Sequence, residues 1–63
     1  MELRKFNNKV VRITDIDDQT FEGICLYEDK DVYDEELDGL SVKSGTRWTK
    51  FFEDEIKEVE IIA

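Results

Sequence analysis

The chain has no histidine, no proline and only one cysteine, Cys25, among its 63 residues. A single cysteine excludes an internal disulfide, and without histidine a zinc site would have to combine Cys25 with carboxylates, a poor ligand set for structural zinc. General base catalysis at neutral pH also lacks its commonest side chain. We therefore expect a non-enzymatic protein with no catalytic residue, no metal site and no cofactor, and we interpret Cys25 as a small core residue.

Basic residues are also few, with nine Lys and Arg against 17 Asp and Glu and a formal net charge of -8. Affinity for phosphates comes from clustered Lys and Arg, so this net charge disfavours RNA as a partner. The charge alternates along the chain as +3, -10, +3 and -4 in residues 1–14, 15–38, 39–52 and 53–63. The acidic stretch 29–38 departs from a calcium loop at the fifth and sixth positions, so we interpret it as a solvated loop, with weak cation binding as the alternative.

No apolar run is long enough to cross a bilayer, and the first residues lack the apolar stretch of a signal peptide. A lone thiol without an export signal is typical of the reducing cytoplasm, where we expect this protein. The length predicts a single domain, 1–63, whose core supplies only roughly 3–5 kcal/mol. Association with copies of the chain, or with another protein, is therefore an expected source of further stability.

The apolar residues that are present alternate with polar ones, which predicts short strands. We expect five, at residues 9–16, 20–28, 40–43, 47–52 and 58–62. Leu3 and Phe6 lie one helical turn apart, which predicts a short N-terminal helix at 2–6 ended by Asn7 and Asn8, with a loose chain end as the alternative. Acidic residues 53–55 predict a single helical turn before the last strand.

Gly23 lies inside the second expected strand, two residues after Phe21 and six before Asp29. Glycine within a strand is typical of a sharp bend. A bend here would let a small sheet curl toward a closed barrel. Both faces of this strand are apolar, which indicates that neither is simply solvated; the faces carry Phe21, Cys25 and Tyr27 on one side and Ile24 and Leu26 on the other.

With Phe21, Gly23 and Asp29 at this spacing, the chain resembles the Sm-like (LSm) family over most of its length. Leu3 and Phe6 match the family's N-terminal helix, Val11 and Ile13 match its first strand, and residues 55–62 match its closing turn and fifth strand. The resemblance implies an all-β, five-stranded SH3-like (Sm-like) barrel with a short N-terminal helix, formed by the single domain 1–63.

The positions that bind RNA in the family differ in this chain. Asp18 stands where a glycine is usual, Asp31 where a base-stacking aromatic or histidine is usual, and Tyr33 where an asparagine reads the base edge. The Arg-Gly pair is absent, and the corresponding region reads Phe-Glu-Asp-Glu at 52–55. Only Asp29 matches a pocket residue, so we do not expect the family's uridine pocket here.

The resemblance also implies rings, because Sm-like subunits pair the fourth strand of one with the fifth strand of the next. Opposite charges occur on these two strands, Arg47 and Lys50 on the fourth and Glu58 and Glu60 on the fifth. Facing opposite charges favour strand pairing. We therefore expect a subunit interface at these four residues and a homo-oligomer; pairing within one barrel, or simple solvation of the charges, is the alternative.

The segment 43–52 is the one candidate for nucleic-acid or partner contact. It contains Lys43, Arg47 and Lys50 beside Trp48, and bases stack on aromatic side chains next to cations. The alternative is that Trp48 and the following phenylalanines supply the core and interface.

We thus expect a non-enzymatic binding or assembly module that self-associates through its edge strands and suits a protein partner, with no membrane association. The alternatives are an RNA-binding Sm-like protein that uses this basic and aromatic surface, and a monomeric SH3-like adaptor.

Overall fold

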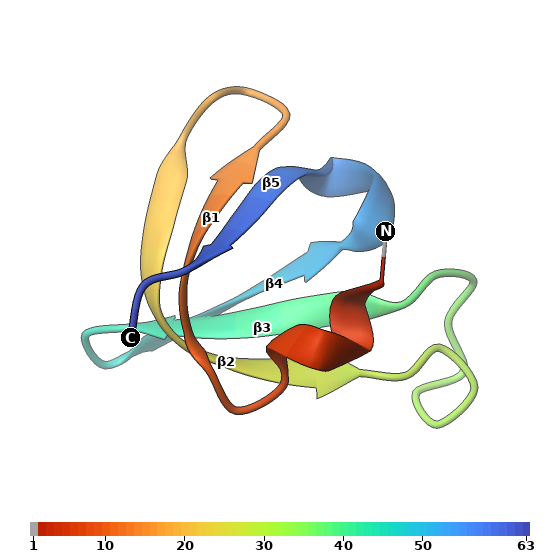
Figure 1. Cartoon of the computed structure of the whole chain (residues 1–63). Helices are drawn as coiled ribbons and strands as arrows, with labels where there is room; N and C mark the ends of the chain where they lie inside the picture. Colours follow the sequence, from red (N-terminus) through yellow and green to blue (C-terminus); the bar gives the residue numbers. More distant parts are fainter. Residues whose placement is uncertain (1) are drawn as a thin grey trace.

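Five strands and two short 3-10 turns make up the structure, a computed structural model that describes residues 2–63 (Figure 1). The elements in chain order are η1 (Leu3–Phe6), β1 (Val10–Asp15), β2 (Thr20–Glu28), β3 (Gly39–Ser44), β4 (Arg47–Phe52), η2 (Glu53–Glu55) and β5 (Ile56–Ile61). The strands form one antiparallel sheet in the order β4-β3-β2-β1-β5. The prediction of a small all-β domain with five strands is confirmed. Across residues 2–63, no helix combines the length and the apolar character needed to cross a membrane.

The sheet is open rather than closed. β4 pairs with β3 alone and β5 pairs with β1 alone, so within residues 2–63 each of these two strands keeps one edge without a neighbouring strand. The expected closed barrel is therefore corrected to a five-stranded sheet with two free edges. The fifth strand also begins earlier than expected, at Ile56, because its start pairs with Asp15 across a bulge after Thr14.

β2 changes its partner near Gly23. Its first half pairs with β1, from Thr20 to Ile24, and its second half pairs with β3, from Ile24 to Glu28. Figure 1 shows the strand curving from the side of β1 to the side of β3. A Cβ atom at residue 23 would lie 1.8 Å from the carbonyl oxygen of Lys43, so only glycine fits this approach. The prediction that residue 23 lies inside a bent strand is confirmed.

The core is built from the inward-facing residues of the strands and from η1. Because side chains alternate across a strand, Val11 and Ile13 of β1 and Leu40 and Val42 of β3 share the buried face. Cys25 of β2 lies between these strands and is fully buried, as expected. Among residues 2–63 the buried apolar residues are Leu3, Phe6, Val11, Ile13, Cys25, Leu40, Val42, Phe51 and Ile56, with Phe21, Tyr27 and Val59 packed against them.

The N-terminal segment is a single 3-10 turn, where a short helix was expected. Leu3 and Phe6 are both buried on its inner side, which confirms that they share a face. The turn ends at Asn7, whose backbone leaves the helical region at ψ 130° and whose side-chain oxygen accepts the backbone N–H of Tyr27 at 2.9 Å. Asn8 follows in the left-handed conformation, at φ 63°, which Asn tolerates better than most residues. This turn contacts β2 and covers one end of the core.

Candidate binding surfaces

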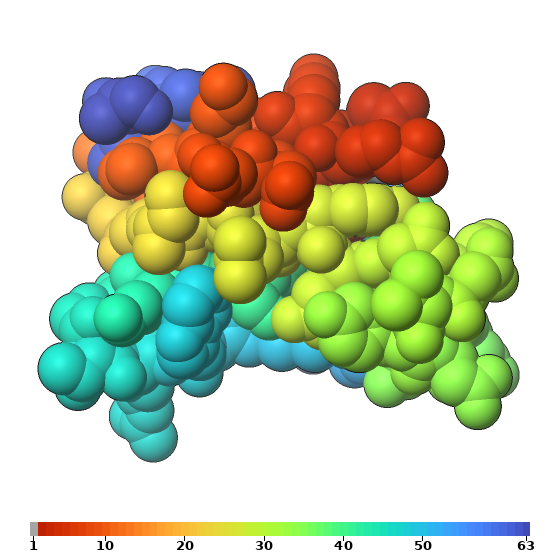
Figure 2. Space-filling model, turned by 90° about the horizontal axis from the view of Figure 1, so that it is seen from below, coloured from red at the N-terminus to blue at the C-terminus, as the bar shows by residue number. Residues whose placement is uncertain are grey.

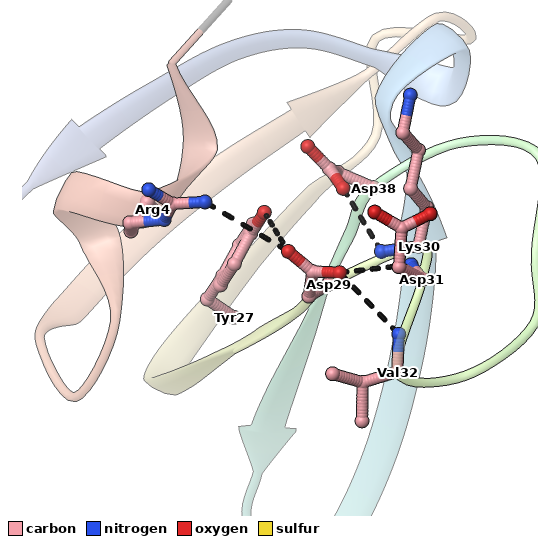
Figure 3. A network of polar contacts seen from close by, with 7 residues as sticks. All are labelled: Arg4, Tyr27, Asp29, Lys30, Asp31, Val32 and Asp38. Carbon is pink, nitrogen blue, oxygen red and sulfur yellow. Dashed lines mark hydrogen bonds and ion pairs between the residues drawn. The ribbon is translucent and has the colours of Figure 1, made fainter.

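Asp29, the residue that matches the Sm-like pocket, is used here to shape a loop (Figure 3). Its Oδ1 accepts the backbone N–H groups of Asp31 at 2.8 Å and Val32 at 3.3 Å. Its Oδ2 accepts the hydroxyl of Tyr27 at 3.4 Å and lies 3.8 Å from the Arg4 guanidinium. The backbone hydrogen bond from Asp31 is the main reason why the pKa of Asp29 lies below its usual value. The carboxylate is thus a charged acceptor that holds the start of the loop.

The loop 29–38 is closed at its far end by Asp38, whose Oδ1 accepts the backbone N–H of Lys30 at 2.9 Å. Its apolar side chains point away from the core, and Val32 is 76% exposed. Tyr33 and Leu37 are also exposed. Asp31 and Tyr33, expected from the resemblance at base-binding positions, therefore belong to a solvated acidic loop. Asp31 has no ring, and the ammonium near the Tyr33 ring, that of Lys50, is paired with Glu28.

Lys50 is engaged within the chain. Its Nζ lies 2.8 Å from Oε1 of Glu28, whose Oε2 accepts the hydroxyl of the buried Ser41. The same ammonium lies 4.7 Å from the ring centroid of Phe52 and 5.4 Å from that of Tyr33. Burial raises the pKa of Glu28, but the hydrogen bonds from Lys50 and Ser41 outweigh it and lower that pKa below its usual value. Lys50, expected at a partner surface, therefore ties the acidic loop to the outer face of the sheet.

The other predicted contact residues lie on or near the outer face of the β3–β4 hairpin. Ile24, Lys43 and Trp48 are neighbours in register on β2, β3 and β4, so they share one face. Trp48 is 48% exposed, whereas Phe51 is buried. Of the aromatics that the alternative assigned to the core and interface, Phe51 thus lies in the core and Trp48 lies outside it. Arg47 is exposed at the start of β4.

Of the four charged residues expected at a subunit interface, two form ion pairs within residues 2–63 and two form none. Glu60 lies on β5 and forms an ion pair with Arg12 at 2.9 Å, and Arg12 also binds Glu22 at 2.7 Å. Lys50 is paired with Glu28, as described above. Arg47 and Glu58 are exposed and make no ion pair within residues 2–63. Because β4 and β5 are the two opposite edges of the sheet, one chain does not bring these two charges together by strand pairing.

Sequence reasoning missed the two cross-strand charge clusters, Glu28 with Lys50 and Arg12 with Glu22 and Glu60. The residues of the second cluster are register neighbours, since Arg12 pairs with Glu22 on one side and with Glu60 on the other. The sequence shows basic and acidic residues on these strands, but only the register of all three strands determines which of them are in contact.

The remaining candidate sites offer little chemistry. Burial raises the pKa of the Cys25 thiol to about 11, so at neutral pH it is not a thiolate nucleophile. Residues 2–63 contain no group of three or more Cys, Asp or Glu side chains placed to hold a metal ion. A cavity of about 360 Å³ lies between the acidic loop and the end of β4, lined by Asp34, Glu35, Glu36, Leu37, Phe52 and Asp54.

Comparisons of the chain with family models, with curated proteins and with solved structures find no match.

Proposed function

We propose that this protein is a non-enzymatic, Sm-like binding and assembly module that self-associates by pairing β4 of one chain with β5 of the next. The observation that carries the proposal is the strand order β4-β3-β2-β1-β5, in which these two strands are the free edges of an antiparallel sheet. Free edges carry unpaired backbone N–H and C=O groups, and proteins tend to cover them. Pairing β4 with β5 within one chain, the alternative considered from the sequence, is not present in this sheet.

The charges of the two edges support this pairing. Arg47 on β4 and Glu58 on β5 are exposed, and opposite charges on facing strands contribute roughly 0.2–1 kcal/mol per pair. Lys50 and Glu60 add less than the sequence suggested, because each is already paired within its own chain. Six residues in each edge strand set the upper limit for the backbone ladder between two chains.

Charge reversal at the edges tests this proposal. Arg47→Glu and Glu58→Lys each place like charges on the facing strands, so we expect the association constant to fall about tenfold, and the double variant to recover most of it. Sedimentation equilibrium gives the association constants. Lys5→Glu, an exposed change of the same size on η1, is the matched control. A chain that stays monomeric at high micromolar concentration, or a double variant that shows no recovery, would refute strand-edge assembly.

The second candidate function is single-stranded RNA binding, and the exposure of Trp48 beside Lys43 favours it. An exposed ring next to cations offers a base a stacking surface worth roughly 1–3 kcal/mol. Oligo-U and oligo-A titrations monitored by Trp48 fluorescence test it. RNA binding predicts saturable quenching that weakens steeply with salt, because cations are released from the phosphates. Quenching that is absent, or that does not respond to salt, leaves a protein partner as the better interpretation.

The curl of the sheet and the location of the protein complete the proposal. Gly23, the register of β2 and the buried Leu3 and Phe6 support an SH3-like, Sm-like curl of the sheet, with closure supplied by neighbouring chains. A monomeric SH3-like adaptor is the alternative, and a monomer with no concentration dependence would favour it. The buried free thiol of Cys25 fits a reducing compartment, so we place the protein in the cytoplasm.

A further inference from the structure

An apolar and basic surface lies at one end of the sheet. It consists of Ile24, Leu26, Lys43 and Trp48 on the outer face, together with the exposed Arg47, which leaves the end of β4 toward the opposite face, and we call it the hairpin face. Trp48 is about half exposed and Leu26 is 42% exposed. Segment 39–52, which contributes three of these five residues, carries three basic residues and no acidic one. Exposed apolar side chains next to basic ones, on a chain with a net charge of -8, favour a partner that is apolar and negatively charged.

The acidic loop 29–38 has the matching properties. It carries six acidic residues and one basic residue, a net charge of -5. Val32, Tyr33 and Leu37 are exposed among these charges, and the hydrogen bonds to Asp29 and Asp38 hold the loop in one shape. A loop that is already shaped loses less conformational entropy when it binds.

Within one chain the loop reaches the outer face at Lys50, whose ammonium lies 5.4 Å from the Tyr33 ring centroid, and not at the hairpin end of that face. Lys43 lies four residues beyond Gly39, where the loop joins β3, so about 13 Å of strand separate the loop from it. Figure 1 shows the loop and the hairpin turn at opposite sides of the molecule. In Figure 2 they form two lobes, green for the loop and cyan for the hairpin, with the surface hollowed between them.

We propose that the acidic loop 29–38 of one copy docks on the hairpin face of a second copy. The contact is head-to-tail, because it joins two different surfaces, and it leaves one free loop and one free face on every pair. Val32 and Tyr33 lie against the apolar part of the hairpin face, while the carboxylates of the loop approach Lys43 and Arg47. This inference rests on the proposed self-association, but it uses the loop rather than the strand edges.

Trp48 is the single tryptophan of the chain, so its fluorescence reports occupancy of the hairpin face directly. We expect its emission to shift to the blue as the concentration of the wild-type chain rises from low micromolar to millimolar. The loop variant Asp31→Lys/Glu36→Lys changes two exposed side chains that make no hydrogen bond or ion pair in the described part of the chain. We expect it to lose the shift, with an apparent affinity at least roughly tenfold weaker.

The control separates this contact from general repulsion. The two reversals remove two negative charges and add two positive ones, which brings the net charge from -8 to -4 and by itself favours association. Glu2→Lys/Asp17→Lys makes the same change at exposed positions outside the loop. A docking loop predicts weaker association for the loop variant and equal or stronger association for this control.

Complementation gives the sharpest result. The face variant Lys43→Glu/Trp48→Thr is not fluorescent at the tryptophan wavelength but keeps its loop. When it is mixed with the loop variant, whose face is intact, we expect the Trp48 shift to return and sedimentation to show a one-to-one dimer. A wild-type shift that persists in the loop variant, or a mixture without a shift, overturns the docking contact.

The same measurements keep the two interfaces apart. If Arg47→Glu and Glu58→Lys weaken the association while the loop variant does not, the strand-edge proposal stands and the loop contact is wrong. If the loop variant abolishes the shift and Glu58→Lys leaves it unchanged, the loop contact stands and the strand-edge proposal fails.

Discussion

Gly23→Ala tests the physical basis of the fold most directly. The new Cβ would lie 1.8 Å from the carbonyl oxygen of Lys43 and 2.7 Å from its carbonyl carbon. Both are backbone atoms of β3, so a side-chain rotation cannot relieve the collision. The two strands must separate at the point where β2 changes partner, and the hydrogen bonds of Ile24 with β3 are weakened as a result.

The expected cost follows from the size of the collision. Inserting a methyl group into a packed site costs typically 1–3 kcal/mol, and a contact with rigid backbone belongs at the upper end, about 3 kcal/mol. The chain has roughly 3–5 kcal/mol of stability in total. A loss of about 3 kcal/mol reduces the ratio of folded to unfolded chains on the order of 100-fold. Gly23→Ala should therefore be partly unfolded at 25 °C.

Urea unfolding followed by Trp48 fluorescence measures this loss. With an m-value of about 1 kcal/mol/M for a small domain, the midpoint should fall by about 2–3 M urea. Gly45→Ala is the matched control, because its Cβ meets no atom within 4 Å and only the positive φ of 66° opposes it. That strain costs roughly 1–2 kcal/mol. If Gly23→Ala were as stable as the wild type, or more stable than Gly45→Ala at equal chain concentration, the close approach of β2 and β3 would be wrong.

Three further predictions concern the core and the charge clusters. Because burial raises the pKa of Cys25 to about 11, a disulfide reagent at mild alkaline pH should modify this thiol only as fast as the chain unfolds, and rapid labelling without urea would contradict the burial. The pKa of Glu28 is lowered in the folded chain, so its ion pair with Lys50 contributes stability above the unfolded pKa, near 4.5, and that contribution is lost as the pH falls through the folded pKa. As the pH falls, the urea midpoint should decline less steeply in Glu28→Gln than in the wild type. An identical decline in both would show that the Glu28 carboxylate does not contribute to the pH dependence of stability. Ile13→Val should cost about 0.5–1.5 kcal/mol by removing a methylene from a fully buried site, while the same change at the exposed Ile16 should be close to neutral in the same urea experiment.

Local patterns were sufficient to predict the strands. Val11 and Ile13 alternate with polar neighbours, and both are fully buried. Gly23 was expected inside a bent strand and lies there, because a residue without a side chain lets a second backbone approach the strand closely. Asn8 was expected to end the N-terminal turn and adopts the required left-handed conformation. The alternation and the end of the turn depend on neighbours within a few residues, whereas the contact that requires glycine at residue 23 is made with Lys43 on β3.

Features that depend on distant residues were harder to predict. Lys50 looked available for a partner, but the register of β2, β3 and β4 places it against Glu28, 22 positions away in the sequence. For Trp48 the sequence left two alternatives open, a contact surface or the core and interface, and only its register with Lys43 shows that it points outward from the core. Asp29 matched a binding position, and its contacts with the loop backbone give it a local structural part instead.

The amino-acid sequence by itself determined that this protein is a small all-β domain, where its five strands run and at which glycine the second strand bends, because alternation and the absence of a side chain act within one segment. The tertiary structure alone decided that the sheet ends at two free edges, and which charges are already paired and which remain exposed. The physical reason is that strand order and register are set by contacts between segments far apart in the chain, and a shift of one residue in any strand would exchange its two faces.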